Sequence, residues 1–210
     1  MKVLELFAGT KSFSKVAEEK GYKTFTIDNN EEFNPDLCID ILDFDISMLP
    51  KEFRNPDIIW ASPPCTTFSV ASISTHWKGG SKAYIPKTEK SKKGLKIVEK
   101  TIKIIKELNP KFWIIENPRG VLRKVISLKR EPTTITYCQY GDKRMKPTDL
   151  WNNFGFIGKR CKNGMPCHEP APRGSRTGTQ GLKNNKERSV VPERLCKEIL
   201  DKLKAGENNE

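Results

Sequence analysis

Short apolar runs alternate with amphipathic segments along most of the chain, and this alternation constrains the possible folds more than any other feature. The apolar runs have the length of buried strands, and several of the longer segments between them have helical spacing. This alternation is typical of an α/β fold with a mainly parallel sheet and helices on both faces. The predicted strands are residues 3–7, 24–27, 37–41, 58–60, 112–115 and 133–137, and the predicted helices are residues 12–19, 94–108 and 192–204.

Composition excludes several classes of protein. No apolar run approaches the roughly 20 residues that a membrane-spanning helix needs, so we expect no membrane association. The N-terminus lacks the pattern of a signal peptide, and six irregularly spaced cysteines indicate reduced thiols in a cytosolic compartment. The formal net charge of +12 predicts a polyanionic partner, most often nucleic acid.

The charge is unevenly distributed. Residues 28–57 hold nine acidic and two basic side chains, whereas residues 78–106 hold ten lysines and only Glu89 and Glu99. This contrast suggests two ligands, one small with hydroxyls or amines for carboxylates to bind, and one polyanionic. We expect the Lys-rich residues 71–93 to form a long loop.

Polar or special residues follow five of the predicted strands. Ligands of parallel sheets bind beyond the carboxyl ends of the strands, so these residues predict one site, although the same residue types also favour ordinary turns. Gly9 lets the backbone approach a ligand, Asp28 suits ribose hydroxyls, and Asp40 suits an exocyclic amine. The strand ends carry Ala8-Gly9, Asp28, Asp40, Pro63-Pro64-Cys65 and Glu116-Asn117-Pro118.

Cys65 and Glu116 are the predicted reactive pair. Cys65 follows two prolines where a helix could begin, and a helix N-terminus or a nearby cation lowers the pKa of a thiol. A buried, protonated Glu116 could donate to a ring nitrogen. Together the two side chains suit nucleophilic attack on an electron-poor heterocycle.

The motifs around these residues resemble those of DNA (cytosine-5) methyltransferases. The resemblance implies the α/β, Rossmann-like fold of methyltransferases that use S-adenosylmethionine as their cofactor. One departure is that Lys11-Ser12 stands where the family has a glycine pair. The matching segments are Leu4-Glu5-Leu6-Phe7-Ala8-Gly9, Ala61-Ser62-Pro63-Pro64-Cys65-Thr66-Thr67-Phe68-Ser69, Glu116-Asn117-Pro118-Arg119-Gly120, Tyr140-Gly141 with Arg144 and Lys146, and Arg188-Ser189-Val190-Val191-Pro192.

The resemblance also implies a mechanism and its residues. Cys65 would add to cytosine C6 while Glu116 engages N3, C5 would take a methyl group from S-adenosylmethionine, and Arg144 would help to hold a base flipped out of DNA. The implied cofactor-binding residues are Phe7, Ala8, Gly9, Asp28, Asp40, Ile41, Pro63, Ser189 and Val190. The expected nucleic-acid-binding residues are Ser69, Lys78, Lys82, Lys146, Arg173 and Arg176.

The length of the chain leaves little room for a target-recognition domain. We expect a catalytic domain at residues 1–154, a short basic insert at 155–187, and a C-terminal motif and helix at 188–210 that pack back on the catalytic domain. Specificity would then be short, relaxed, or supplied by a protein partner. We expect a monomer in the cytoplasm of a prokaryote or of a phage-infected host cell.

Two further questions stay open at this point. The function could instead be methylation of an exocyclic amine, methylation of RNA, or DNA binding without catalysis. In the insert, zinc could bind Cys161, Cys167 and His168, with Cys138 or Cys196 as a fourth ligand. We favour free thiols and an exposed histidine, and therefore no metal site, because the spacing is not the usual Cys-x2–4-Cys.

Overall fold

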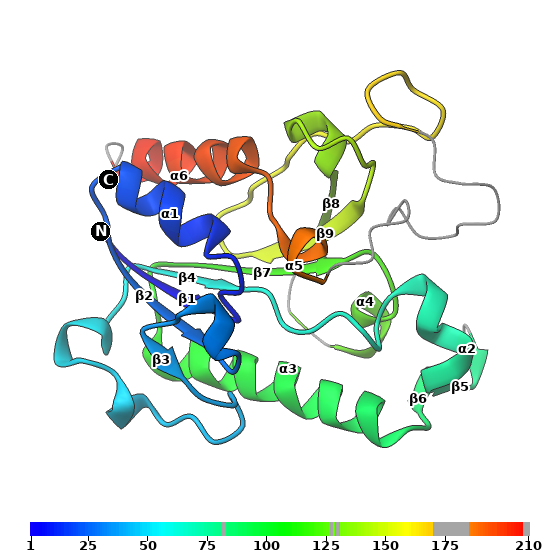
Figure 1. The fold of residues 1–210 in the computed structure, drawn as a ribbon, viewed down its shortest axis with the longest axis horizontal. Coiled ribbons are helices and arrows are strands. Elements are labelled where there is room, and N and C mark those ends of the chain that lie inside the picture. Colours follow the sequence, from blue (N-terminus) through cyan, green and yellow to red (C-terminus); the bar gives the residue numbers. More distant parts are fainter. Residues whose placement is uncertain (81–82, 127, 129–130, 170–184, 208–210) are drawn as a thin grey trace.

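The apolar runs form one seven-stranded sheet in the computed structural model, which describes residues 1–80, 83–126, 128, 131–169 and 185–207 (Figure 1). The strand order is β3-β2-β1-β4-β7-β9-β8, and β9 alone runs in the opposite direction to the other six strands. The expectation of a mainly parallel α/β sheet is confirmed. The strands are β1 (Lys2–Leu6), β2 (Lys23–Asp28), β3 (Leu37–Cys38), β4 (Ile58–Ala61), β7 (Phe112–Pro118), β8 (Thr133–Thr136) and β9 (Pro147–Asn152).

Three longer helices cover the sheet. Helices α1 (Ser12–Glu19) and α6 (Glu193–Glu207) lie on one face, and α3 (Glu89–Leu108) lies on the other (Figure 1). Shorter elements are the helices α2 (Ile73–His76), α4 (Leu122–Val125) and α5 (Asn185–Ser189), the 3-10 turns η1 (Glu31–Phe33), η2 (Ile46–Met48), η3 (Lys51–Phe53), η4 (Val70–Ser72) and η6 (Tyr137–Tyr140), and the antiparallel pair β5 (Trp77–Lys78) and β6 (Ile85–Pro86). None of the described helices is long and apolar enough to span a bilayer.

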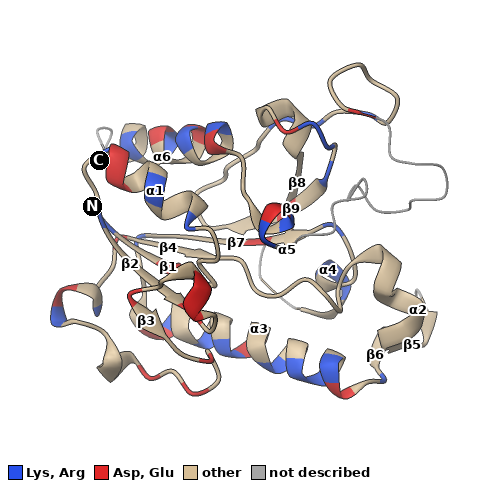
Figure 2. Cartoon of the chain, viewed as in Figure 1, with Lys and Arg blue, Asp and Glu red and all other residues tan. Residues whose placement is uncertain are grey.

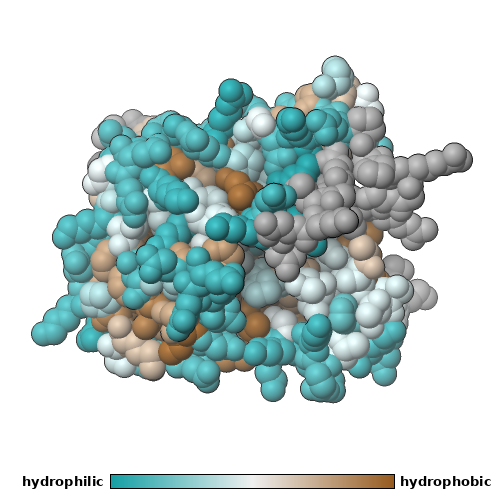
Figure 3. All heavy atoms as spheres, viewed as in Figure 1, coloured by the Kyte–Doolittle hydropathy of each residue, from teal (hydrophilic) through white to brown (hydrophobic). Residues whose placement is uncertain are grey.

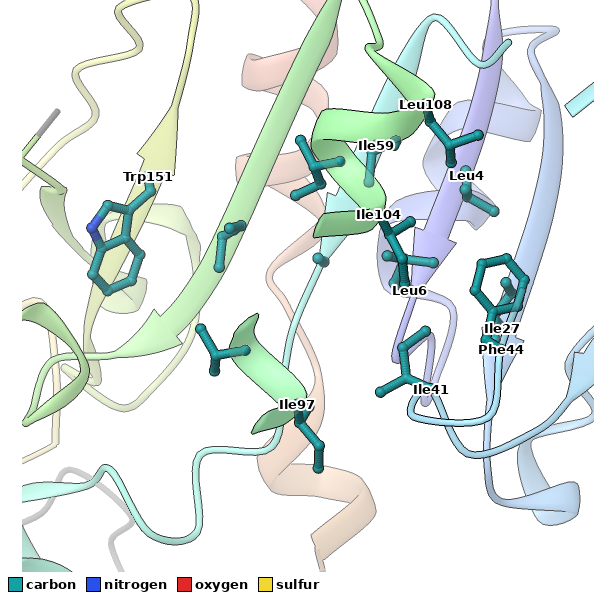
Figure 4. Packing of buried hydrophobic residues seen from close by; sticks show 14 of the residues in the cluster. Leu4, Leu6, Ile27, Ile41, Phe44, Ile59, Ile97, Ile104, Leu108 and Trp151 are labelled. Carbon is teal, nitrogen blue, oxygen red and sulfur yellow. The ribbon is translucent and has the colours of Figure 1, made fainter. Parts of the chain in front are cut away.

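Apolar residues of the central strands point to both faces of the sheet, which is why these strands read as continuous hydrophobic runs. On one face, Leu4 and Leu6 of β1 pack with Ile104 of α3 in the cluster of Figure 4. On the other face, Trp60 of β4 stacks on Phe13 of α1, with 4.5 Å between ring centroids. Hydrophilic residues cover most of the outer face shown in Figure 3. The sheet is therefore buried on both faces, and this packing holds the ends of its strands in place.

The segment predicted as a loop, residues 71–93, is more ordered than expected. It contains α2, the β5-β6 pair and the first turn of α3, which begins at Glu89 and not at residue 94. The cause is a capping box, in which the Ser91 backbone N–H and the Thr88 backbone N–H each bond to the other residue's hydroxyl, at 3.2 and 3.1 Å. In addition, the buried Trp77 donates from Nε1 to the Thr67 carbonyl at 2.6 Å.

One strand, β3, is shorter than predicted, and another, β9, was not predicted at all. The strand predicted at residues 37–41 ends at Cys38, because Asp40 forms a turn in which its side chain accepts from the Leu42 N–H at 3.1 Å. The sequence analysis missed β9, whose polar residues are paired: the buried Asp149 binds Arg123 through Oδ2 and Nε at 2.8 Å. Polar strands that bury paired charges have no apolar alternation to reveal them.

Candidate active site

A cavity of about 810 Å³ lies at the carboxyl ends of the strands. It is close to the point between β1 and β4 where the strand order reverses, which is where open α/β sheets bind their ligands. The cavity brings together residues that are far apart in sequence. Of the predicted site residues, it is lined by Phe7, Ala8, Gly9, Asp28, Pro63, Cys65, Ser69, Glu116, Arg144, Lys146 and Ser189.

Cys65 follows β4 through Ser62-Pro63-Pro64 and faces this cavity. No helix begins at Cys65; its carbonyl instead accepts from the backbone N–H groups of Phe68 and Ser69, at 3.0 and 3.2 Å, which closes a tight turn. Burial raises the pKa of the Cys65 thiol, and the neighbouring Glu116 carboxylate raises it further. The prediction of a lowered thiol pKa was therefore wrong, because desolvation outweighs the nearby cations.

Glu116 lies on β7 and is buried. Its Oε1 accepts a hydrogen bond from the Tyr137 hydroxyl at 3.0 Å. Burial, followed by the charge of Glu116, raises the pKa of Tyr137 well above its ordinary value, so this phenol stays a donor. Tyr137 thus fixes one carboxylate oxygen of Glu116. Nothing in the sequence pattern distinguished it from a core aromatic residue.

The loops after β4 and β7 are locked to one another. The buried Asn117 donates from Nδ2 to the Pro63 carbonyl at 2.8 Å, and the Val121 N–H donates to the Phe68 carbonyl at 2.8 Å. A side chain at Gly120 would bring its Cβ within 2.0 Å of the Phe68 carbonyl oxygen. These contacts hold the Cys65 turn and the Glu116 strand in one fixed relation.

The other end of the cavity is built on the turn after β1. Gly9 has φ of +47° and donates its N–H to Asp28 Oδ2 at 2.9 Å. The second carboxylate oxygen of Asp28 accepts from the Asn30 N–H, also at 2.9 Å. Asp28 therefore organises this turn as well as facing the cavity.

Two other predicted cofactor residues, Asp40 and Ile41, line a smaller adjoining pocket of about 40 Å³, which shares Phe7 and Asp28 with the main cavity. The Asp40 carboxylate lies 2.8 Å from the Lys93 amine, and this hydrogen bond lowers the pKa of Asp40. Val190 does not line either pocket; it is 41% exposed, and its neighbour Val191 faces the main cavity instead.

The first and last motifs close on each other at this end. The Val191 N–H donates to the Ser12 hydroxyl at 3.1 Å. Lys11 precedes α1 in a left-handed conformation with φ of +56°, which is unfavourable for a residue other than glycine. Ser12 thus serves as an anchor for the C-terminal motif, and the side chain of Lys11 makes no capping hydrogen bond to α1.

Glu5 is a cavity-lining residue that the sequence analysis did not select. It lies in the middle of β1 with 2% of its surface exposed, and its carboxylate accepts from the Ser14 N–H at 2.8 Å. Burial raises the pKa of Glu5 to about 7. An acidic residue inside an apolar strand was the available indication. Phe33 and Asn29 also line the cavity.

Of the residues predicted to contact nucleic acid or the flipped base, some line the cavity, Lys78 lies outside it, and three are not among the described residues. Arg144 is buried and forms a two-oxygen ion pair with Asp142, with Nη2 2.5 Å from Oδ2. Lys146, whose pKa burial lowers, places its amine 4.2 Å from the centre of the Tyr137 ring and donates to the Arg188 carbonyl at 3.1 Å. Lys78 is exposed on β5 and does not line the cavity. Lys82, Arg173 and Arg176 lie outside the described residues.

Comparison with known proteins gives a consistent result. A protein of Frog virus 3 (isolate Goorha), named "Probable DNA (cytosine-5)-methyltransferase", is 33% identical over 218 residues, covering 96% of this chain and 99% of the viral protein. The structure of Entamoeba histolytica methyltransferase EhMeth matches with a TM-score of 0.51 and 14% identity, over 76% of this chain and 56% of that one. This likeness shows the fold alone.

The family model described as C-5 cytosine-specific DNA methylase matches residues 1–131, which include β1, the Cys65 turn and Glu116. This match alone covers more than half of the chain. The viral relative covers 96% of the chain at 33% identity and supports the same family. The chain belongs to the C-5 cytosine-specific DNA methylase family.

Proposed function

We propose that the protein transfers a methyl group from S-adenosylmethionine to C5 of cytosine in DNA. The observation that carries the proposal is the single cavity lined by Cys65, Glu116 and the Gly9–Asp28 turn. A thiol and a carboxyl group at one end of a cavity, with a ligand-binding glycine turn at the other, fit a reaction between a heterocycle and a cofactor.

The cofactor fits the chemistry of the second end. Asp28 offers a carboxylate of the type that binds ribose hydroxyls, and the smaller pocket combines the apolar Ile41 with the Asp40 carboxylate, which could accept from an adenine amine. When bound, S-adenosylmethionine supplies an electrophilic methyl group. Phe7 and Pro64 line both pockets and would hold it between them.

The proposed reaction uses Cys65 and Glu116 in turn. The Cys65 thiolate adds to cytosine C6, while Glu116 engages N3 and so favours electron density at C5. C5 would then take the methyl group as its bond to the cofactor sulfur breaks, which leaves S-adenosylhomocysteine. Loss of the C5 proton to a base and cleavage of the C6–sulfur bond would release 5-methylcytosine and the Cys65 thiolate. Because the resting thiol has a raised pKa, Lys146 and Arg188, whose charges both favour the thiolate, would assist its deprotonation.

The substrate base has to leave the duplex to reach this cavity. Arg144 and Ser69 line the same cavity as Cys65 and could contact the flipped nucleotide. We also propose that residues 155–187 stand in place of a target-recognition domain. The protein would act as a monomer, and a separate protein partner could supply sequence specificity. Native mass spectrometry with and without DNA tests the monomeric state.

The decisive experiment is incubation with labelled S-adenosylmethionine and either DNA or RNA, followed by nucleoside analysis. We expect 5-methyl-deoxycytidine from DNA, no product from Cys65→Ser, and wild-type product from Cys38→Ser, which changes an exposed thiol outside the cavity. An N-methylated base, label in RNA alone, or equal product from Cys65→Ser would contradict the proposal. Absence of both cofactor binding and product would favour a DNA-binding module.

A further inference from the structure

Four side chains that the proposed reaction does not use converge beside η6. Cys138 belongs to η6, whereas Cys161, Cys167 and His168 belong to the segment that follows β9, in yellow and gold at the upper right of Figure 1. One possible ligand atom from each of the four side chains lies within 4.8 Å of the other three. The cysteine spacing favoured free thiols and an exposed histidine here, whereas the structure gathers these side chains in one cluster.

Three spacings between these atoms are close to those of a tetrahedron around one metal ion. With zinc–sulfur bonds of about 2.3 Å and zinc–nitrogen bonds of about 2.0 Å, a tetrahedral site has sulfur–sulfur edges of about 3.8 Å and sulfur–nitrogen edges of about 3.5 Å. The Cys167 and Cys138 sulfurs are 3.8 Å apart. His168 Nδ1 lies 3.7 Å from the Cys161 sulfur and 3.6 Å from the Cys167 sulfur.

A fourth edge, between the Cys138 and Cys161 sulfurs, distinguishes a metal site from a disulfide. The Cys138 and Cys161 sulfurs are 3.1 Å apart, far longer than the bond of about 2.05 Å in a disulfide. Binding a metal requires this edge to open by a fraction of an ångström. Cys196, the other candidate for the fourth ligand, is instead buried in the hydrophobic cluster between α6 and α1.

The surroundings support metal-bound thiolates. The Gln139 side chain lies with Nε2 3.2 Å from the Cys167 sulfur, where it can donate a hydrogen bond. The Cys161 backbone N–H donates to the Thr136 hydroxyl at 2.8 Å, which fixes that ligand's backbone to the end of β8. Hydrogen bonds of this kind orient ligands and moderate the charge on sulfur.

We propose that Cys138, Cys161, Cys167 and His168 bind one Zn²⁺ in a closed, structural site. Three thiolates and one imidazole complete four-coordination and leave no position for a reacting water. Residues 162–167 are exposed and include no helix or strand, so they have little core of their own. The metal would tie this segment to η6, as metals do in small regions that lack a core.

The site would also steady the chain next to the cavity. η6 leads directly into residues 141–146, which carry Arg144 and Lys146, and the Glu169 N–H donates to the Lys143 carbonyl at 2.9 Å. Zinc would therefore link the start of the predicted basic insert to the loop that lines the cavity. The metal site itself does not depend on the proposed methylation.

Metal analysis of the full-length protein tests the proposal. After expression with added ZnCl₂ and purification under reducing conditions, we expect about one zinc per chain. Cys167→Ser, at an exposed position, and His168→Gln should each lose most of it, whereas Cys38→Ser should keep it. Zinc absent from the wild-type protein, or unchanged in both cluster variants, would overturn the proposal.

Cobalt substitution gives a second readout that does not depend on variants folding. Co²⁺ added to the zinc-free, reduced protein should produce the intense visible bands of tetrahedral coordination and the ultraviolet band of thiolate-to-cobalt charge transfer. Weak bands of six-coordinate cobalt would overturn the proposed geometry. A Cys138–Cys161 disulfide, found by mass spectrometry in protein purified without oxidant, would overturn the site itself.

Discussion

The Cys65 thiol sits among groups with opposing effects on its ionisation. Burial and the Glu116 carboxylate raise its pKa, while Lys146 and Arg188 act in the other direction. Lys146 is itself held over the Tyr137 ring, so its position is fixed and not that of a free surface amine. The reactivity of Cys65 therefore depends on these two neighbouring cations as well as on the thiol itself.

Replacing Lys146 by methionine tests this dependence. Loss of the cation should raise the pKa of Cys65 further and slow its alkylation at a given pH. The rate of iodoacetamide labelling at Cys65, followed by peptide mass spectrometry across a pH series, measures the shift. Lys78→Met, which removes an exposed lysine outside the cavity, is the control, and an unchanged profile in Lys146→Met would refute the role of the cation.

Glu5 gives the protein a pH-dependent stability. Its pKa is about 7 in the folded chain against 4.5 ordinarily, so the folded state binds more protons between these values and stability falls as pH rises through this range. The full effect of such a shift is about 3 kcal/mol. In Glu5→Gln we expect the free energy of unfolding, measured by urea denaturation from pH 5 to 8, to lose this slope. A slope equal to that of the wild type would contradict the assignment.

Among the elements, the contact between the loops after β4 and β7 leaves no room for a side chain. Gly120→Ala would force Cβ against the Phe68 carbonyl, so we expect a loss of about 2 kcal/mol in stability and a lower methylation rate. Denaturation and initial rates at saturating cofactor measure the two effects. Gly206→Ala in α6, where Cβ meets nothing within 4 Å, is the matched control, and equal behaviour of the two variants would exclude the steric role.

The same elements show what a sequence can and cannot reveal. Apolar runs and the rule that ligands bind at strand ends were enough to predict β1, β4, β7 and the residues that follow them. By contrast, β9 was missed because its buried Asp149 is paired with Arg123 of α4, and the role of Tyr137 depends on a partner 21 residues away. Such contacts are set by tertiary packing, which local periodicity does not encode.

At the scale of the whole molecule, the lysines that contribute to the net charge of +12 lie at both edges of the sheet, and only one of these edges carries the cavity. Figure 2 shows basic residues, in blue, along α3, and this helix runs back from the carboxyl edge of the sheet, where it begins after β6, toward the start of β7. Lys78 and Lys90 therefore lie toward the edge that carries the cavity, whereas Lys103 and Lys106 lie toward the opposite edge. All four are exposed.

This placement predicts that position, and not net charge alone, governs DNA binding. Lys78→Glu with Lys90→Glu should weaken binding to a DNA duplex and reduce the slope of log K against log salt concentration by about 2, because two phosphate contacts are lost. Lys103→Glu with Lys106→Glu changes the net charge equally but should leave that slope nearly unchanged. Fluorescence anisotropy over a salt series compares the two variants. An equal loss in both would mean that DNA responds to the overall charge, and that the carboxyl edge is not the face that DNA approaches.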